Sequence, residues 1–278
     1  MAAILEKLFR GENLPILFGV SIVAFLLIFE CGYRIGQKRR ASIDEASKTW
    51  VTAIYSAILG MLGLLLGFSF SLAQQRFEVR RQLVVEEANA IGTTYLRAQW
   101  LAEPYRGDIA KLLRQYVDAR LPKDLESRNI DELVQNVSVL SESLLDQLWS
   151  HAVEVAKKHP TPVVALFLSA LNETIDLHAK RLAQFQNRVP ESVLLLLYLF
   201  ATVAMLITGY GSGLRTQRCV LPTVAMVVLL STSLYVIVDL DRPRQGLINV
   251  IQESLIRLQQ KLMAGPETSA PIGGQRTK

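Results

Sequence analysis

Four stretches of the chain are apolar and long enough to cross a membrane, and helical patterns fill most of the sequence between them. The apolar stretches cover residues 14–33, 50–75, 193–210 and 219–238. A helix rises ~1.5 Å per residue, so about 20 apolar residues span the ~30 Å hydrocarbon core of a bilayer. The sequence therefore predicts an all-α membrane protein with four transmembrane helices, the first two within residues 1–75 after a short N-terminal tail.

The second apolar stretch opens the longest predicted helix, residues 48–103. Residues 49–75 carry no charge and as a helix would be about 40 Å long, more than the hydrocarbon core. The sequence then becomes amphipathic without a break, and no proline occurs before Pro104. We expect one helix, or two nearly collinear helices, that leave the membrane and enter an extramembrane domain.

Residues 76–190 predict that helical extramembrane domain between spans 2 and 3. Apolar residues recur at helical spacing within residues 105–121 and 131–159, and a further helix runs from Pro162 to residue 189. Amphipathic helices of this length bury their apolar stripes in a bundle. Residues 172–178 are dense in polar groups, which is typical of a solvated face or a contact between helices.

The C-terminal part holds spans 3 and 4 within residues 191–240 and then an amphipathic helix within residues 241–263. The stripe of that helix is formed by Leu247, Ile251, Leu255, Leu258 and Leu262. Residues 264–278 are poor in apolar side chains, which predicts a disordered tail.

The net charge of +5 does not indicate nucleic-acid binding, because many basic residues flank the apolar stretches. There they anchor to lipid headgroups and set the topology, and no nucleic-acid recognition motif is present. Four spans put both termini and the large helical segment on one side of the membrane. The basic residues of the two short loops slightly outnumber those near the termini, which by itself favours the short loops as cytoplasmic.

Catalytic and metal-binding signatures are missing from the sequence, so we expect neither an enzyme nor a cofactor. It has no phosphate loop, no Gly-x-Ser-x-Gly motif and no paired-cysteine motif. None of His151, His159 and His178 has a histidine partner three or four residues away, which argues against a metal site. Cys31 and Cys219 are either two free thiols or a redox-sensitive pair, and we favour free thiols.

The predicted spans contain few charged residues, which argues against a proton-coupled transporter and is compatible with an apolar pore. Glu30, near the end of the first span, either pairs with Arg34 four residues later or binds an ion; we favour the pair. In the second span, apolar residues follow each other at steps of four. These residues are Gly60, Leu64, Phe68 and Leu72. Their face could pack against lipid or another helix, or it could line a pore.

One segment of the long helix resembles the second-helix signature of bacterial bestrophin-family channels. It comprises Leu66-Gly67-Phe68, Arg76-Phe77, Arg81 and Asn89. Over nearly its whole length the chain more closely resembles a group of bacterial inner-membrane proteins called bestrophin-like. The residues that carry this likeness are Glu30-Cys31-Gly32-Tyr33-Arg34, Arg80-Arg81, Glu87-Ala88-Asn89-Ala90-Ile91-Gly92-Thr93, Tyr95-Leu96-Arg97 and Asp239-Leu240-Asp241-Arg242-Pro243.

The resemblance implies a pentamer in the inner membrane, with the second helices around a central pore. It also implies that the large domain and the termini are cytoplasmic, against the slight preference from charge. The hydrophobic neck of the channels would correspond to Gly60, Leu64 and Phe68. Because Gly60 replaces a bulky apolar residue, one constriction ring would be missing. Asp239 and Asp241 alone do not make the acidic calcium cluster of animal bestrophins.

Basic residues stand where the long helix leaves the membrane: Arg76, Arg80 and Arg81. If they face a pore they attract anions; otherwise they anchor to the interface or pair with Glu86 or Glu87. The resulting hypothesis is a homo-oligomeric channel in the bilayer for small ions, most simply anions. The alternative is a non-conducting sensor or scaffold whose helical domain binds a partner or ligand.

Overall fold

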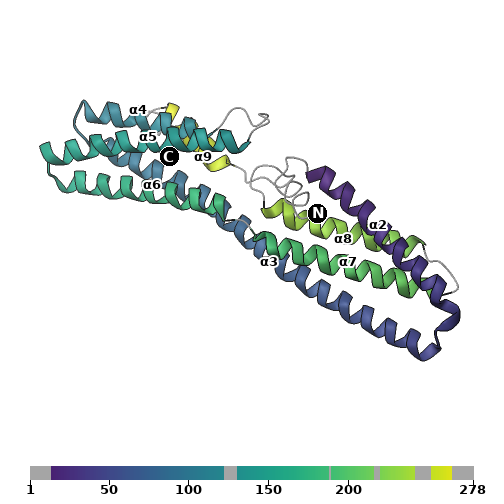
Figure 1. Ribbon diagram of the computed structural model, residues 1–278. Coiled ribbons are helices and arrows are strands. Elements are labelled where there is room, and N and C mark those ends of the chain that lie inside the picture. Colours follow the sequence, from purple (N-terminus) through teal and green to yellow (C-terminus); the bar gives the residue numbers. More distant parts are fainter. Residues whose placement is uncertain (1–13, 122–129, 188, 216–219, 242–251, 265–278) are drawn as a thin grey trace, which may run out of the picture. The chain divides into compact units, whose positions relative to one another are not determined.

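The computed structural model describes residues 14–121, 130–187, 189–215, 220–241 and 252–264, and the elements in these ranges are all helices (Figure 1). They are α2 (Leu14–Arg39), the 3-10 helix η1 (Arg40–Ser42), α3 (Glu45–Ala98), α4 (Tyr105–Arg120), α5 (Ile130–Lys158), α6 (Pro162–Gln186), α7 (Glu191–Gly213), α8 (Val220–Asp241) and α9 (Glu253–Ala264). Four helical segments among the described residues are long and apolar enough to span a membrane. The predicted all-α fold with four spans is therefore confirmed.

The chain divides into two compact units, and α3 contributes to both. The membrane unit comprises residues 1–78 and 188–249, and the extramembrane unit comprises residues 79–187 and 250–278. Helix α3 is continuous over 54 residues, so the first of the two expected arrangements, a single helix, is correct.

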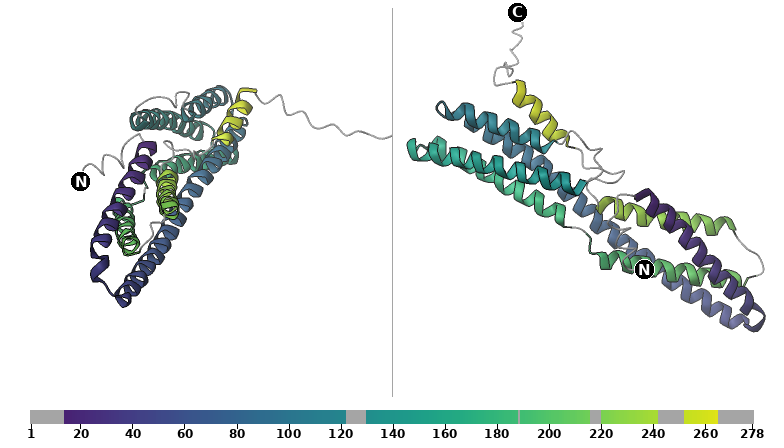
Figure 2. Two further views of the ribbon diagram at one scale, coloured as in Figure 1. Left: turned by 90° about the vertical axis from the view of Figure 1, so that its right-hand side faces the viewer. Right: turned by 45° about the horizontal axis from the view of Figure 1, so that its top comes forward.

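In the membrane unit, α2 packs against α7 and α8 (Figures 1 and 2). Glycines of α2 and α7 make the closest approach. A Cβ atom on Gly32 or Gly36 would overlap the carbonyl oxygen of Leu206 or Tyr210, respectively. Gly209 and Gly213 meet the backbone of α2 in the same way. Only glycine allows two backbones to approach so closely, which is the usual way that small residues join helices in lipid.

Polar contacts at the ends of the membrane helices agree with local sequence rules. Arg34 Nε donates to Glu30 Oε1 at 2.9 Å, so the expected i,i+4 pair is confirmed.

Within the bundle, Tyr198 stacks on Phe25 and its hydroxyl lies 3.1 Å from Ser21 Oγ. Cys31 is a free, exposed thiol, and Cys219 lies outside the described residues.

In the extramembrane unit, one hydrophobic core joins α3, α4, α5, α6 and α9. Its most deeply buried members include Ile91, Ile109, Leu113, Leu148, Phe167 and Leu171. Helix α9 contributes three leucines of its predicted stripe, Leu255, Leu258 and Leu262, and Arg114 Nε donates to the carbonyl of Leu262 at 2.9 Å. The other predicted members of that stripe, Leu247 and Ile251, lie outside the described residues, as do the N-terminal tail and the tail from residue 265 onward.

Candidate functional site

The apolar face of α3 is the least covered surface of the membrane unit. Only 6% of the most apolar window of α3 is buried, against 28%, 33% and 28% in the other three spans. Leu64 and Phe68 are 57% and 61% exposed, and nothing lies within 4 Å of a Cβ added to Gly60. Within the described part of the chain, the three predicted neck residues therefore share an open face that lipid or another protein chain could cover.

The opposite side of the same helical segment packs into the membrane bundle. Leu62 is 3% exposed and Ala73 is fully buried. Farther toward the start of α3, Val51 and Tyr55 lie within contact distance of a Cβ added to Gly211 of α7. The membrane half of α3 thus packs against the bundle along one side, and its other side is available to a partner.

The three predicted pore-mouth arginines occupy different environments. Arg81 is exposed, whereas Arg76 is partly buried and its Nη1 atom has no hydrogen-bond partner among the residues that the structure describes. Arg80 is only 4% exposed. It donates to the carbonyls of Gln184 at 3.3 Å and Asn187 at 3.0 Å. Because the last carbonyls of a helix have no partner within it, Arg80 satisfies the C-terminal end of α6.

Glu87 lies at the centre of a buried charged cluster in the extramembrane unit. Its side chain is fully buried and accepts from Arg120 Nε at 3.0 Å and Nη2 at 3.3 Å. Arg181 Nη1 of α6 donates to Oε2, the oxygen that also accepts from Arg120 Nη2. The hydroxyl of Tyr116 donates to Glu87 Oε1 at 2.7 Å. One carboxylate therefore ties α3 to both α4 and α6.

The cluster holds Glu87 as a carboxylate. Burial alone would raise its pKa, but the charges of Arg181 and Arg120 and the hydrogen bond from Tyr116 outweigh burial and lower that pKa to about 2. For Tyr116, burial and the nearby carboxylate raise the pKa well above its ordinary value. Tyr116 therefore stays protonated and acts as a donor, as the charged acceptor requires.

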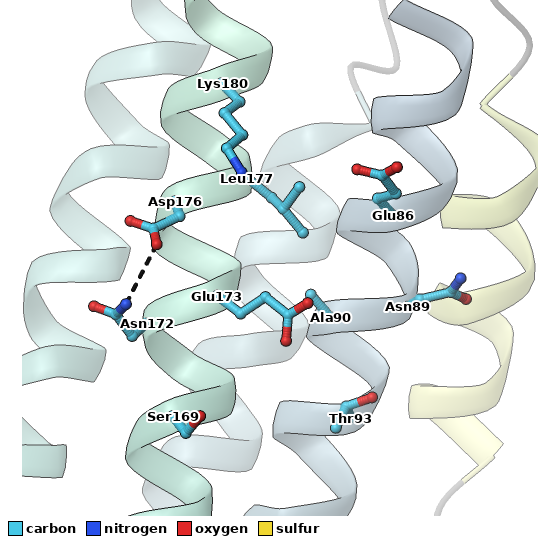
Figure 3. A pocket seen from close by; sticks show the side chains of 10 residues that line it. All are labelled: Glu86, Asn89, Ala90, Thr93, Ser169, Asn172, Glu173, Asp176, Leu177 and Lys180. Atoms are coloured by element: carbon cyan, nitrogen blue, oxygen red, sulfur yellow. Dashed lines mark hydrogen bonds between the residues drawn. The ribbon is translucent and has the colours of Figure 1, made fainter. Parts of the chain in front are cut away.

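A polar pocket of about 540 Å³ lies between α3 and α6 in the extramembrane unit (Figure 3). It is lined by Glu86, Asn89, Ala90, Thr93, Ser169, Asn172, Glu173, Asp176, Leu177 and Lys180. Glu173 reaches from α6 toward α3, and Asn172 Nδ2 donates to Asp176 Oδ2 at 3.3 Å (Figure 3). Residues 172–178 therefore form both a solvated face and a contact between helices. Asn172, Glu173 and Asp176 face solvent, whereas Thr174 and His178 are buried.

The acidic motif residues near the end of α8 have a structural partner. Both carboxylate oxygens of Asp241 accept from the backbone N–H of Val189, at 2.9 and 3.0 Å, just before α7 begins. Asp239 is 1% exposed. Arg242 and Pro243 lie outside the described residues. In the described part of the chain, no group of three or more His, Cys, Asp or Glu side chains could hold a metal ion.

Two features were not recognised in the sequence. The first is the crossing of α2 and α7, although the spacing of four between Gly32 and Gly36 and between Gly209 and Gly213 carries a signal for it. The second is the set of partners around Glu87, which come from α4 and α6. No local pattern links residues that are 33 and 94 positions apart.

Comparison with known proteins assigns the chain to a known architecture. A family model described as Bestrophin-like domain matches residues 18–255. A solved structure of a bacterial bestrophin homologue from Klebsiella pneumoniae superposes with a TM-score of 0.65 at 13% identity, over 90% of this chain and 97% of that chain. A mutant structure described as a membrane protein gives a TM-score of 0.58 at 15% identity, over 87% and 97% of the two chains. No curated protein matches the chain significantly.

Proposed function

The chain belongs to the Bestrophin-like family, and on that premise we propose that it forms a homo-oligomeric ion channel whose pore is lined by α3. The observation that carries the proposal is the open face of α3, where Leu64 and Phe68 are more than half exposed beside Gly60. A ring of such faces from several chains encloses an apolar passage, and a narrow apolar passage can gate by dewetting. One α3 per chain cannot enclose a pore alone, so the proposal requires an oligomer, and we propose a pentamer.

In this proposal Phe68 and Leu64 form the neck, and Gly60 marks a wider position. Arg76 and Arg81 attract anions where α3 leaves the membrane. Arg80 is buried against the end of α6. It therefore attracts anions only through the electrostatic potential of its positive charge. The motif residues Glu87, Asn89, Asp239 and Asp241 maintain the shape of the subunit, and we place Arg242 and Pro243 with them.

The proposal also assigns the membrane arrangement. The spans are residues 14–33, 50–75, 193–210 and 219–238. Residues 76–190 form the extramembrane domain, followed after span 4 by the amphipathic helix within residues 241–263 and the tail 264–278. We propose that this domain and the termini lie on the cytoplasmic side of a bacterial inner membrane, as the resemblance implies.

Flux from liposomes tests the proposal. Purified wild-type protein, Phe68→Ala and Leu64→Ala are reconstituted and the release of anions and of cations is measured separately. We expect the neck variants to raise the flux or alter its selectivity, because a smaller side chain widens and wets the constriction. Leu229→Ala is the matched control, since Leu229 lies on α8 and is 69% exposed. Absence of flux from every folded and inserted variant would reject a pore through α3.

A non-conducting sensor or scaffold is the second candidate, and the polar pocket between α3 and α6 is the observation that favours it. Its volume of about 540 Å³ lies within the range of small-ligand sites, roughly 300–1,000 Å³. The oligomeric state distinguishes the two candidates, because a chain that is monomeric or dimeric in the bilayer cannot line a pore with α3.

A further inference from the structure

Five side chains from three helices form the buried cluster around Glu87, and their charges do not balance. Glu87, Tyr116, Arg120, His178 and Arg181 are each at most 6% exposed. The cluster contains two guanidinium groups and one carboxylate, so it carries one excess positive charge while His178 is neutral. Buried charges are tolerated only when each is paired, so a further positive charge here is unfavourable.

The hydrogen bonds determine which nitrogen of His178 carries the proton. The Tyr116 hydroxyl has a single proton and donates it to the ionised carboxylate of Glu87 at 2.7 Å. The contact of 3.1 Å between this hydroxyl and His178 Nδ1 therefore has Nδ1–H as the donor. In the neutral ring Nε2 is then a bare acceptor, and this buried atom has no hydrogen-bond partner among the described residues.

Protonation of His178 would add a proton at Nε2, where the described part of the chain offers no acceptor, and a second excess positive charge. The groups that face the ring are Glu87 on α3, Tyr116 and Arg120 on α4, Glu142 on α5 and Arg181 on α6. Burial, followed by the charge of Arg120, lowers the pKa of His178, and the carboxylates of Glu87 and Glu142 offset this only in part.

We propose that His178 is an acid-sensitive switch of the extramembrane unit, whose protonation at Nε2 loosens the packing of α3, α4 and α6 around Glu87. The neutral ring is favoured in the closed arrangement, and the charged ring is favoured once the cluster opens to water. Stability is therefore fully present above the ordinary histidine pKa of about 6.5 and falls as the pH drops below it. The switch does not depend on ion conduction.

Hydrogen–deuterium exchange of the full chain in lipid nanodiscs tests the switch. Opening of the segments 79–98, 105–120 and 162–186 is compared at about pH 7.5 and about pH 5.5, after correction for intrinsic exchange. At about one pH unit below 6.5 the opened state gains up to roughly tenfold in population. Glu87 stays ionised at both pH values, since its pKa is about 2.

Histidine variants identify the responsible group. His178→Gln should abolish the additional opening at the lower pH, whereas His151→Gln and His159→Gln should retain it. An unchanged pH effect in His178→Gln, or no pH effect in the wild type, would overturn the proposal. If His178→Gln does not fold, the double variant that lacks His151 and His159 leaves a single histidine to follow by NMR. Its titration midpoint should lie below about 6.5, and a midpoint at or above that value would overturn the proposal equally.

Discussion

The two halves of α3 are packed in opposite ways. In the membrane unit the helix leaves Leu64 and Phe68 more than half exposed. In the extramembrane unit the same helix supplies a full stripe to the core, formed by Val84, Ala88, Ile91, Tyr95 and Ala98. Lipid solvates an exposed leucine as well as another leucine does, so the membrane half is free to keep a face for partners. Water solvates apolar side chains poorly, so the extramembrane half must bury its apolar stripe.

The glycines of the membrane unit show the same contrast. Gly32 and Gly36 of α2 touch the backbone of α7, whereas nothing lies within 4 Å of a Cβ added to Gly60, Gly63 or Gly67 of α3. The crossing of α2 and α7 is thus completed within one chain. Gly60, Gly63 and Gly67 would allow another helix to approach closely, but no part of the described chain packs there.

Glu87→Gln should produce the largest effect, because it leaves two buried guanidinium groups without a counter-charge. Removing one partner of a buried ion pair costs about 3–5 kcal/mol. Thermal or denaturant unfolding of the extramembrane unit measures the loss. Glu86→Gln is the matched control, since Glu86 is the exposed neighbour on the same helix, and its change should stay within about 0.5 kcal/mol. Equal effects of the two substitutions would contradict the assigned role of Glu87.

Acid should remove the same counter-charge gradually. The pKa of Glu87 is lowered in the folded protein from 4.5 to about 2, so the carboxylate stabilises the fold fully above about pH 4.5 and this contribution is lost as the pH falls toward 2. Unfolding measured across this range in wild type and in Glu87→Gln isolates the contribution. The variant should show a shallower dependence, and parallel curves would exclude Glu87 as the titrating group.

Ile91→Ala and Leu64→Ala compare the two halves of α3 directly. Ile91 is fully buried, so its truncation should destabilise the extramembrane unit by about 2–5 kcal/mol. Leu64 is 57% exposed within the chain, and its truncation should leave that unit unchanged. Hydrogen exchange of the extramembrane core in the two variants measures both effects. Similar protection in the two would contradict the contrast between the halves.

Gly32→Val should separate α2 from α7, because the added side chain would overlap the carbonyl of Leu206. Overpacking of this kind costs about 1–3 kcal/mol. The yield of monodisperse protein in detergent and its thermal midpoint report the effect. Gly63→Ala introduces a side chain on α3 where nothing lies within 4 Å, and it should match the wild type.

Much of the architecture could be predicted from local patterns. The apolar runs predicted four spans, and prolines marked helix starts such as Pro162. Arg34 and Glu30 pair as their spacing of four indicates. Arg80 shows what local patterns could not predict. Its place beside Arg76 and Arg81 suggested a pore mouth, but only the fold brings the end of α6, about one hundred positions later, against its guanidinium.

By itself the sequence determined the secondary structure, the membrane class and the family, because these depend on local hydrophobicity, helical period and motif. Only the tertiary structure decided which polar residues meet. Glu87 is one acidic residue among several in α3 until Arg120 and Arg181 converge on it. Likewise, the glycines of α2 and α3 look alike in sequence, and only the packing distinguishes those that are filled from those that are open. The reason is physical: helix formation depends on neighbours within a few positions, whereas pairing of buried charges and close backbone contacts depends on distant segments.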